Sequence, residues 1–194
     1  RHVLELGARQ IATWTKAGLP VVPVSFNVSA GEFMKPGVEQ EIVSLFRGKG
    51  VDPRLVVMEV TESAAMADLT PTMRVLEAWR SLGIGVAIDD FGTGFSSLSY
   101  LRNFPVNSLK IDQSFIRALD DSAGDRALVE SILDLSHKLG LEVVGEGVEL
   151  RSQYDFLREH GCDVIQGYLF SPPVSADEVA LLLQRRELPM APSR

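Results

Sequence analysis

Six short apolar segments of this sequence each end in a side chain that carries an oxygen or an ammonium group. Helix-like patterns separate the segments, and this alternation predicts parallel strands joined by crossover helices. The ends of parallel strands meet at one edge of a sheet, where such folds place binding and catalytic groups. We therefore expect six side chains to converge on one site: Asn27, Glu59, Asp89, Lys110, Glu146 and Gln166.

The strongest local signal is the pair Asp89 and Asp90, which ends an apolar segment and precedes a glycine-rich stretch up to Ser97. Two adjacent carboxylates can bridge two divalent cations about 3.5–4 Å apart, which is the spacing used to cleave phosphodiester bonds. Asp90 can equally cap a turn in the glycine-rich stretch. The pair alone leaves both interpretations open.

Three further residues fit an oxygen-rich metal site. An inward carboxylate at Glu59 would be costly unless it were paired or bound to a metal. Asn27 offers a neutral oxygen that suits Mg²⁺ or Mn²⁺, although Asn at a strand end also forms turns. Glu62 lies beyond the strand, where it can reach a neighbouring loop or help to cap the next helix.

Lys110 is a cation among these carboxylates. It can orient a water molecule or contact a phosphate oxygen. It can also form a balancing ion pair with Asp112, two residues further along the same strand face.

Glu146 and Glu149 follow the fifth strand, and the intervening Gly147 allows a ligand to approach the backbone closely. The pair Gln166 and Gly167 ends the sixth strand and can hydrogen-bond a base or a ribose. Together the polar strand ends favour a metal site over separate structural roles.

The elements that must position these residues follow from apolar periodicity. Thr70 is predicted to cap a helix that has Pro71 at its first position. Helices are predicted over residues 3–16, 36–46, 71–81, 125–139, 152–160 and 176–186, and strands over 21–27, 55–59, 85–89, 108–110, 142–146 and 163–166.

A closed barrel is favoured over an open sheet. Every strand delivers a polar end group, whereas an open sheet normally uses only the strands at its switch point. Small or branched residues lie two positions before most of these groups, as in a barrel interior. A (β/α)₈ barrel needs eight strands, so we interpret two strands as missing before Arg1.

Composition narrows the class of protein. The 194 residues are 45% hydrophobic, enough for one domain with a sizeable core. A net charge of -7 without a basic run disfavours long nucleic acid as a partner.

His2, His137 and His160 fall in helical patterns, which disfavours zinc and histidine-base mechanisms. The single cysteine, Cys162, is interpreted as a buried reduced thiol. Without a membrane-length apolar run or a signal peptide, we expect a cytoplasmic location.

These residues lie in motifs that closely resemble those of the EAL-domain family of cyclic-di-GMP phosphodiesterases. The resemblance extends over residues 1–187 and leaves 188–194 as a frayed tail. The stretch that begins Asp-Asp-Phe-Gly is highly specific. The matching motifs are Phe26–Ser29, Glu59–Ser63, Asp89–Leu101, Leu109–Phe115, Gly145–Glu149 and Gln166–Phe170.

The resemblance implies a (β/α)₈ TIM-like barrel with an antiparallel first strand, of which six parallel strand–helix units are visible. It implies hydrolysis of cyclic-di-GMP to linear pGpG with two Mg²⁺ or Mn²⁺ ions per site. It also implies a homodimer, with sensory or cyclase domains and a membrane tether possible upstream.

The resemblance also implies roles for the residues singled out above. Lys110, Glu146 and Asp90 would be catalytic, with Lys110 activating the water. Glu62 would anchor the segment Asp90–Ser97. Asp112 and Glu149 would support the site. The implied metal ligands are Asn27, Glu59, Asp89, Asp90 and Glu146, and the implied substrate contacts are Gln166 and Gly167.

One departure concerns the Glu-Ala-Leu signature, which is absent together with the strands that would carry it; we interpret this as truncation upstream of Arg1. Two alternatives stay open. One is a catalytically silent cyclic-di-GMP receptor of the same fold, and the other is an interaction module that uses the barrel for dimerisation. Loss of Asp89, Asp90 or Lys110 would favour the alternatives, and all three are present.

Overall fold

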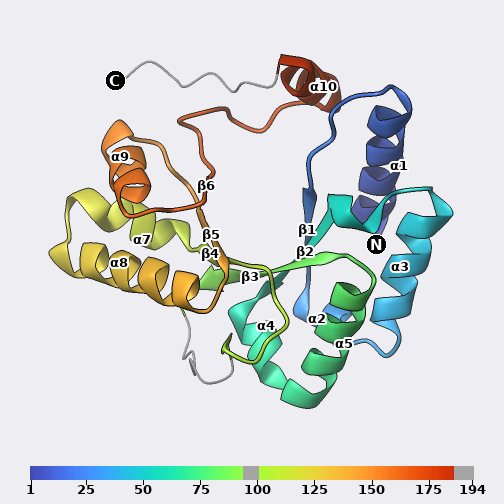
Figure 1. Cartoon of the computed structure of the whole chain (residues 1–194), viewed down its shortest axis with the longest axis horizontal. Helices are drawn as coiled ribbons and strands as arrows, with labels where there is room; N and C mark the ends of the chain where they lie inside the picture. The colour runs from blue at the N-terminus through green and yellow to red at the C-terminus, as the bar shows by residue number, and fades with distance from the viewer. Residues whose placement is uncertain (94–100, 186–194) are drawn as a thin grey trace. The chain divides into compact units, whose positions relative to one another are not determined.

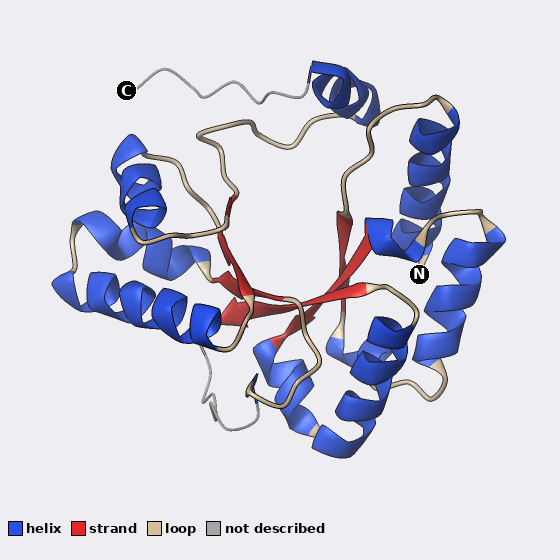
Figure 2. Ribbon diagram, in the orientation of Figure 1, coloured by secondary structure: helices blue, strands red, loops and turns tan. Residues whose placement is uncertain are grey.

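The computed structural model describes residues 1–93 and 101–185. In these residues strands alternate with helices along the chain (Figure 1 and Figure 2). The chain divides into two compact units, described separately below. The first contains residues 1–86 and 173–185, and the second contains residues 87–172.

All six predicted strands are present, with ends shifted by a few residues. The second strand continues two residues beyond Glu59, so that this carboxylate lies inside the strand and not at its end. The strands are β1 Val24–Val28, β2 Val56–Thr61, β3 Gly85–Phe91, β4 Ser108–Ile111, β5 Glu142–Gly145 and β6 Val164–Ile165.

In the first unit, the pleat of β1 separates a packed face from a polar one. Phe26 and Val28 are buried, whereas Ser25 and Asn27 on the opposite face are exposed. The Phe26 ring lies directly against Gly7, where a Cβ atom would collide with it. Asn27 therefore points away from the helix that carries Gly7.

All helices of this unit except the last, which has no buried residue, pack apolar side chains against one another and against the strands. Phe26 packs on Phe46 with ring centroids 5.5 Å apart, and Phe33 packs on the fully buried Trp79 at 5.8 Å. The helices are α1 His2–Lys16, α2 Ala30–Phe33, α3 Val38–Gly48, α4 Glu62–Ala67, α5 Leu69–Ser81 and α10 Ala176–Arg185, with a short 3₁₀ turn at Pro53–Leu55.

The prediction that Thr70 caps its helix is wrong. Helix α5 begins at Leu69, and the Asp68 side chain accepts a hydrogen bond from the Thr70 backbone N–H at 3.2 Å. A carboxylate in the extended residue before the helix is the better cap. Pro71 then lies in the first turn, where its missing N–H costs nothing.

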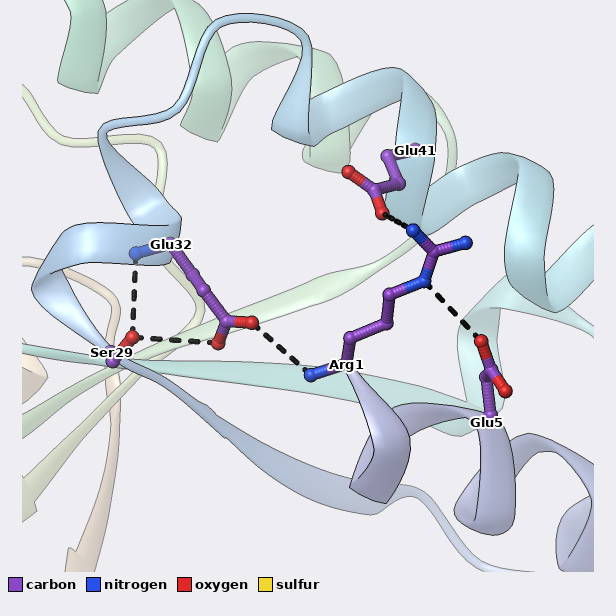
Figure 3. A network of polar contacts seen from close by, with 5 residues as sticks. All are labelled: Arg1, Glu5, Ser29, Glu32 and Glu41. Atoms are coloured by element: carbon purple, nitrogen blue, oxygen red, sulfur yellow. Dashed lines mark hydrogen bonds and ion pairs between the residues drawn. The ribbon is translucent and has the colours of Figure 1, made fainter.

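Ion pairs on the surface of the first unit link α1 to α2 and α3 (Figure 3). The Arg1 guanidinium lies 3.3 Å from Glu5 and 3.2 Å from Glu41, and the Arg1 α-amino group lies 3.1 Å from Glu32. The Ser29 hydroxyl caps α2 by accepting a bond from the Glu32 backbone N–H. Exposed pairs of this kind each contribute about 0–1 kcal/mol.

In the second unit, β3 pairs with β4, β4 with β5 and β5 with β6, all in parallel. Short polar side chains define the helix starts, since Asp112 caps α7 and Ser122 caps α8. The helices are α7 Gln113–Arg117, α8 Ala123–Lys138 and α9 Arg151–Glu159, with a 3₁₀ turn at Ala118–Asp120.

The Asp163 carboxylate joins two elements of this unit. It accepts a hydrogen bond from the Val143 backbone N–H at 2.8 Å and lies 3.0 Å from His137 Nε2. Burial alone would raise the pKa of Asp163, but these two partners outweigh burial and hold that pKa below its usual value. The neighbouring Cys162 is a free, partly buried thiol, and burial raises its pKa to about 11. The thiol is therefore protonated and unreactive at neutral pH.

The frayed tail predicted for residues 188–194 lies outside the described part of the chain. Among the helices that are described, none is long and apolar enough to cross a membrane.

Candidate functional site

The second unit contains an irregularity in β3 at the Asp89–Asp90 pair. Ile88 lies opposite Leu109 of β4, but Phe91 lies opposite Ile111. Two residues of β3 therefore oppose a single residue of β4, which is the arrangement of a β-bulge. Bulges redirect side chains, and this one allows two consecutive carboxylates to leave the strand near the same place.

The single residue opposite the bulge is Lys110. Asp90 absorbs the extra length by adopting a left-handed backbone with φ of 54°, a conformation that non-glycine residues other than Asp and Asn rarely adopt. Its neighbour Asp89 keeps its side chain in the interior and is only 8% exposed. The Asp89 carboxylate also accepts the Asp90 backbone N–H at 3.1 Å.

Lys110 holds two carboxylates from different strands. Its Nζ atom lies 3.1 Å from Asp89 Oδ1 and 2.7 Å from Glu146 Oε1. The Lys110 residue is only 6% exposed, so these pairs are shielded from solvent. A buried ammonium between two carboxylates is a fixed positive charge at the end of β4. The pairing is with Asp89 and Glu146, whereas one sequence-based alternative had named Asp112.

Asp112 has a different set of contacts. Its side chain accepts hydrogen bonds from the backbone N–H and the hydroxyl of Ser114 at the start of α7. The negative charge of Asp112 also acts on Asp90. Partial burial raises the pKa of Asp90, and the carboxylates of Asp89 and Asp112 raise it further, against the opposing effect of Lys110. Negative charge is thus concentrated beyond what one lysine offsets.

A cavity of about 270 Å³ opens beside Glu146. Two of the residues that line it are glycines that pack closely against other parts of the chain. A Cβ atom at Gly147, where φ is +69°, would lie 2.6 Å from Gln113 Cβ, and one at Gly167 would collide with the Val148 backbone. The lining residues are Gln113, Arg117, Glu146, Gly147, Glu149, Gln166, Gly167 and Tyr168.

Glu149 stands at the cavity edge and not beside Lys110. Its carboxylate lies 3.4 Å from the Arg117 guanidinium, and both side chains are at least half exposed. The two glutamates of the motif therefore have different partners: Glu146 contacts Lys110, whereas Glu149 contacts a helix.

Three candidates belong to the first unit. Asn27 and Glu59 are register partners on β1 and β2, so their side chains are neighbours on one face. Glu59 is 6% exposed, and Glu62, the first residue of α4, is 3% exposed. The segment that Glu62 is predicted to anchor runs to Ser97, and its residues from 94 onward lie outside the described chain.

The chemistry of the donor set fits a hard divalent cation. Asp89, Asp90 and Glu146 bring carboxylate oxygens to one region of the second unit, which is the ligand type that Mg²⁺ and Mn²⁺ prefer. Within residues 1–93 and 101–185, no group of three or more His, Cys, Asp or Glu side chains lies close enough together to hold a metal ion.

Sequence reasoning missed several residues at the cavity. Gln113, Arg117 and Tyr168 line it, but their types carry no distinctive signal on their own. Gln113 and Arg117 are the first and last residues of the short helix that begins after the Asp112 cap, and so short a helix has little apolar periodicity to reveal it.

Comparisons with known proteins bear on the family and on the fold. The profile of the EAL domain family matches residues 1–173. MucR of Pseudomonas aeruginosa, described as a bifunctional diguanylate cyclase/cyclic di-GMP phosphodiesterase, is 37% identical over 177 residues, which is 91% of this chain and 26% of MucR. The chain spans about a quarter of the length of the curated relatives that it matches.

Solved structures show the same fold. The MucR phosphodiesterase in complex with c-di-GMP is 37% identical, with a TM-score of 0.88 over 91% of this chain and 72% of that one. The EAL domain of Mycobacterium smegmatis DcpA is 34% identical, with a TM-score of 0.91 over 96% and 84%. Klebsiella pneumoniae BlrP1 in a manganese and cyclic-di-GMP complex is 32% identical, with a TM-score of 0.77 over 88% and 44%. The predicted TIM-like α/β class is thereby confirmed.

Proposed function

The chain belongs to the EAL domain family, and we propose that it is a phosphodiesterase that hydrolyses cyclic-di-GMP to linear pGpG with two Mg²⁺ or Mn²⁺ ions. The observation that carries this proposal is the buried Lys110 ammonium, held between Asp89 and Glu146. The c-di-GMP complex of MucR and the manganese complex of BlrP1 support the choice of substrate and of metal.

Five residues would hold the cations. Bound there, the cations would lower the pKa of a bound water and polarise the scissile phosphate. Asn27 and Glu59 come from the first unit and the others from the second, so their joint action is part of the proposal. The proposed ligands are Asn27, Glu59, Asp89, Asp90 and Glu146.

Lys110 would contribute positive charge where the attacked phosphate gains negative charge. Asp89 and Glu146 hold its Nζ atom from two sides, so little reorganisation is needed when the charge develops. Its N–H groups can also donate a hydrogen bond to the attacking water and fix the direction of attack. Catalytic roles are accordingly proposed for Lys110, Glu146 and Asp90.

The cavity beside Glu146 would accept part of the cyclic dinucleotide. Gln166 brings an amide that can hydrogen-bond a base or ribose, and Gly167 leaves the backbone accessible to the ligand. Asp112 and Glu149 would support the site through Ser114 and Arg117. Glu62 would anchor the segment that follows Asp90.

Assembly and context are also proposals. We infer a homodimer, and we infer that further sensory or cyclase domains accompany this one. The second inference is supported by the chain's matching only about a quarter of its multidomain relatives.

The test is hydrolysis of cyclic-di-GMP by the full-length protein with Mg²⁺ or Mn²⁺, followed by separation of pGpG on an anion-exchange column. Asp89→Asn should reduce turnover to background, because it removes a carboxylate charge that both cations would share. Asp134→Asn is the matched control: it makes the same change at an exposed residue of α8 and should leave turnover unchanged.

Each possible outcome of this assay has a defined meaning. Turnover in the wild type that depends on Asp89 supports the phosphodiesterase. Tight binding of cyclic-di-GMP without turnover would show a receptor of the same fold. Neither binding nor turnover would leave an interaction module as the better account.

A further inference from the structure

The segment between β5 and α9 carries Glu146 and Glu149 but has no regular secondary structure over residues 146–149. Its shape must therefore be set by individual hydrogen bonds. Two of these join it to the chain around β6, and a third joins the preceding residue, Gly145, to the same part of the chain. Gln166 N–H donates to the Gly145 carbonyl at 2.9 Å, Val148 N–H donates to the Gln166 carbonyl at 3.1 Å, and Leu169 N–H donates to the Val148 carbonyl at 3.0 Å.

A buried side chain holds the other end of the segment. Gln153, in the first turn of α9, is only 3% exposed. Its Oε1 atom accepts the Glu149 backbone N–H at 2.9 Å and the Leu150 backbone N–H at 3.0 Å. One oxygen atom thus satisfies two successive donors, and it does so in a place with little access to water.

These bonds restrict where Glu146 can lie. Its backbone lies between two held points. On one side Gly145 is bonded to Gln166, and on the other side residues 148–150 are bonded to the chain around β6 and to Gln153. Gly147 approaches Gln113 closely, because a Cβ atom at this glycine would lie only 2.6 Å from Gln113 Cβ. The 2.7 Å contact between Glu146 and Lys110 depends on this placement.

We propose that Gln153 is a positioning residue for Glu146: it holds the segment that presents this carboxylate to Lys110 and to the cations. The proposal rests on the proposed function, in which Glu146 is a metal ligand. Groups that orient metal ligands typically contribute about 10- to 100-fold to metal affinity or activity. Since Gln153 acts through the backbone, we expect an effect of about 10-fold.

A simpler role must be separated from this one. Gln153 occupies the third position of α9, where Glu or Gln commonly bonds back to the residue before the helix. Leu150 itself has no side-chain acceptor, so Gln153 also caps α9. If Gln153 were only a helix cap, its loss would lower stability. It would then affect metal binding no more than the loss of another helix cap in the same unit.

Ser122 provides that comparison, because its hydroxyl accepts the Asp125 backbone N–H at the start of α8. Three variants are needed. Gln153→Met keeps the length of the side chain and removes the acceptor. Gln153→Glu keeps an acceptor oxygen, and its charge is favourable at a helix N-terminus. Ser122→Ala removes a cap that lies away from Glu146.

The measurements use the full-length protein and Mn²⁺ as the probe. Amide hydrogen exchange over residues 146–150 reports whether the segment is held, and calorimetry reports Mn²⁺ affinity without substrate. We expect Gln153→Met to accelerate exchange there and to weaken Mn²⁺ binding about 10-fold. Gln153→Glu should restore both properties, and Ser122→Ala should lower the melting temperature without changing either.

Hydrolysis against Mn²⁺ concentration then gives the functional consequence. The half-saturating Mn²⁺ concentration should rise in Gln153→Met, while KM for cyclic-di-GMP at saturating Mn²⁺ should change little. The proposal is overturned if Gln153→Met matches Ser122→Ala in exchange and in Mn²⁺ affinity. A wild type that binds no Mn²⁺ and hydrolyses nothing would refute the proposed function, whereas hydrogen exchange would still decide whether Gln153 holds the segment.

Discussion

Replacing Lys110 by Met removes the ammonium that contacts two carboxylates, the buried one of Asp89 and the partly buried one of Glu146. Met has a similar length and no charge, so Asp89 and Glu146 would both lose the ammonium that they contact. At an effective dielectric constant of about 20, contacts of 3.1 and 2.7 Å each correspond to about 5–6 kcal/mol before the cost of desolvation. Removing one partner from a buried pair typically costs about 3–5 kcal/mol net.

We therefore expect Lys110→Met to lower the free energy of unfolding by about 3–5 kcal/mol in the presence of EDTA. Adding Mn²⁺ should recover part of this loss, because a divalent cation bound only by the folded state stabilises it in proportion to ligand concentration. Turnover of cyclic-di-GMP should remain lost at every Mn²⁺ concentration, since the positive charge that we propose for the scissile phosphate is gone.

Urea unfolding followed by circular dichroism, with EDTA and with Mn²⁺, measures both effects. Lys138→Met is the matched control, because Lys138 pairs with Asp134 at 3.2 Å on the exposed face of α8 and should contribute less than about 0.5 kcal/mol. A Lys110→Met chain as stable in EDTA as the Lys138→Met chain would refute the reasoning. So would the recovery of normal turnover.

Three further predictions concern other parts of the second unit. Gly167→Ala should lower the free energy of unfolding by about 3 kcal/mol or more in urea titrations, because its Cβ would collide with the Val148 backbone, which cannot rotate away; unchanged stability would contradict the close approach. Asp90→Asn should stabilise the metal-free chain at pH 7, because a carboxyl whose pKa is raised by folding destabilises the folded state once it ionises. This gain in stability should vanish near pH 3. A variant with the same melting temperature as the wild type at pH 7 as well as at pH 3 would count against the prediction. Folding lowers the pKa of Asp163, so its carboxylate stabilises the folded state above the unfolded pKa of about 3.9, and this stabilisation is lost as the pH falls through the folded pKa. Asp163→Asn should therefore make the free energy of unfolding fall less steeply below about pH 5. Identical acid unfolding curves for variant and wild type would exclude this contribution.

The positions of the strands could be predicted because short apolar runs flanked by glycine and proline are sufficient to mark them. The carboxylates of Asp89 and Glu146 and the ammonium of Lys110 were likewise visible as polar ends of such runs. These properties are local, so one sequence carries them. Their alternation with helices also indicated the parallel α/β class.

The pairing of those side chains could not be predicted, because it depends on register between strands. The bulge at Asp89–Asp90 appears only when β3 is aligned with β4, and it is this alignment that sets Lys110 opposite the pair. Short helices such as α4 and α7 were also missed. They begin at the caps Thr61 and Asp112, and each has fewer than two turns of apolar periodicity to reveal it.

The role of Gln153 was hidden for a similar reason. A glutamine in a helical pattern is ordinarily a surface residue, and nothing in its neighbours marks it as buried. Only the folded chain brings its oxygen under the two N–H groups of Glu149 and Leu150.

In β3, the apolar residues Ile88 and Phe91 lie on either side of the bulge, whereas the two carboxylates lie within it. Ile88 and Phe91 face the packed side on either side of it, aligned with Leu109 and Ile111. If Asp90 were deleted, the remaining residues would match β4 one for one, with every apolar side chain still on its own face. Removal of this one residue would thus keep the apolar packing of β3 while taking away one of the carboxylates proposed to hold a cation.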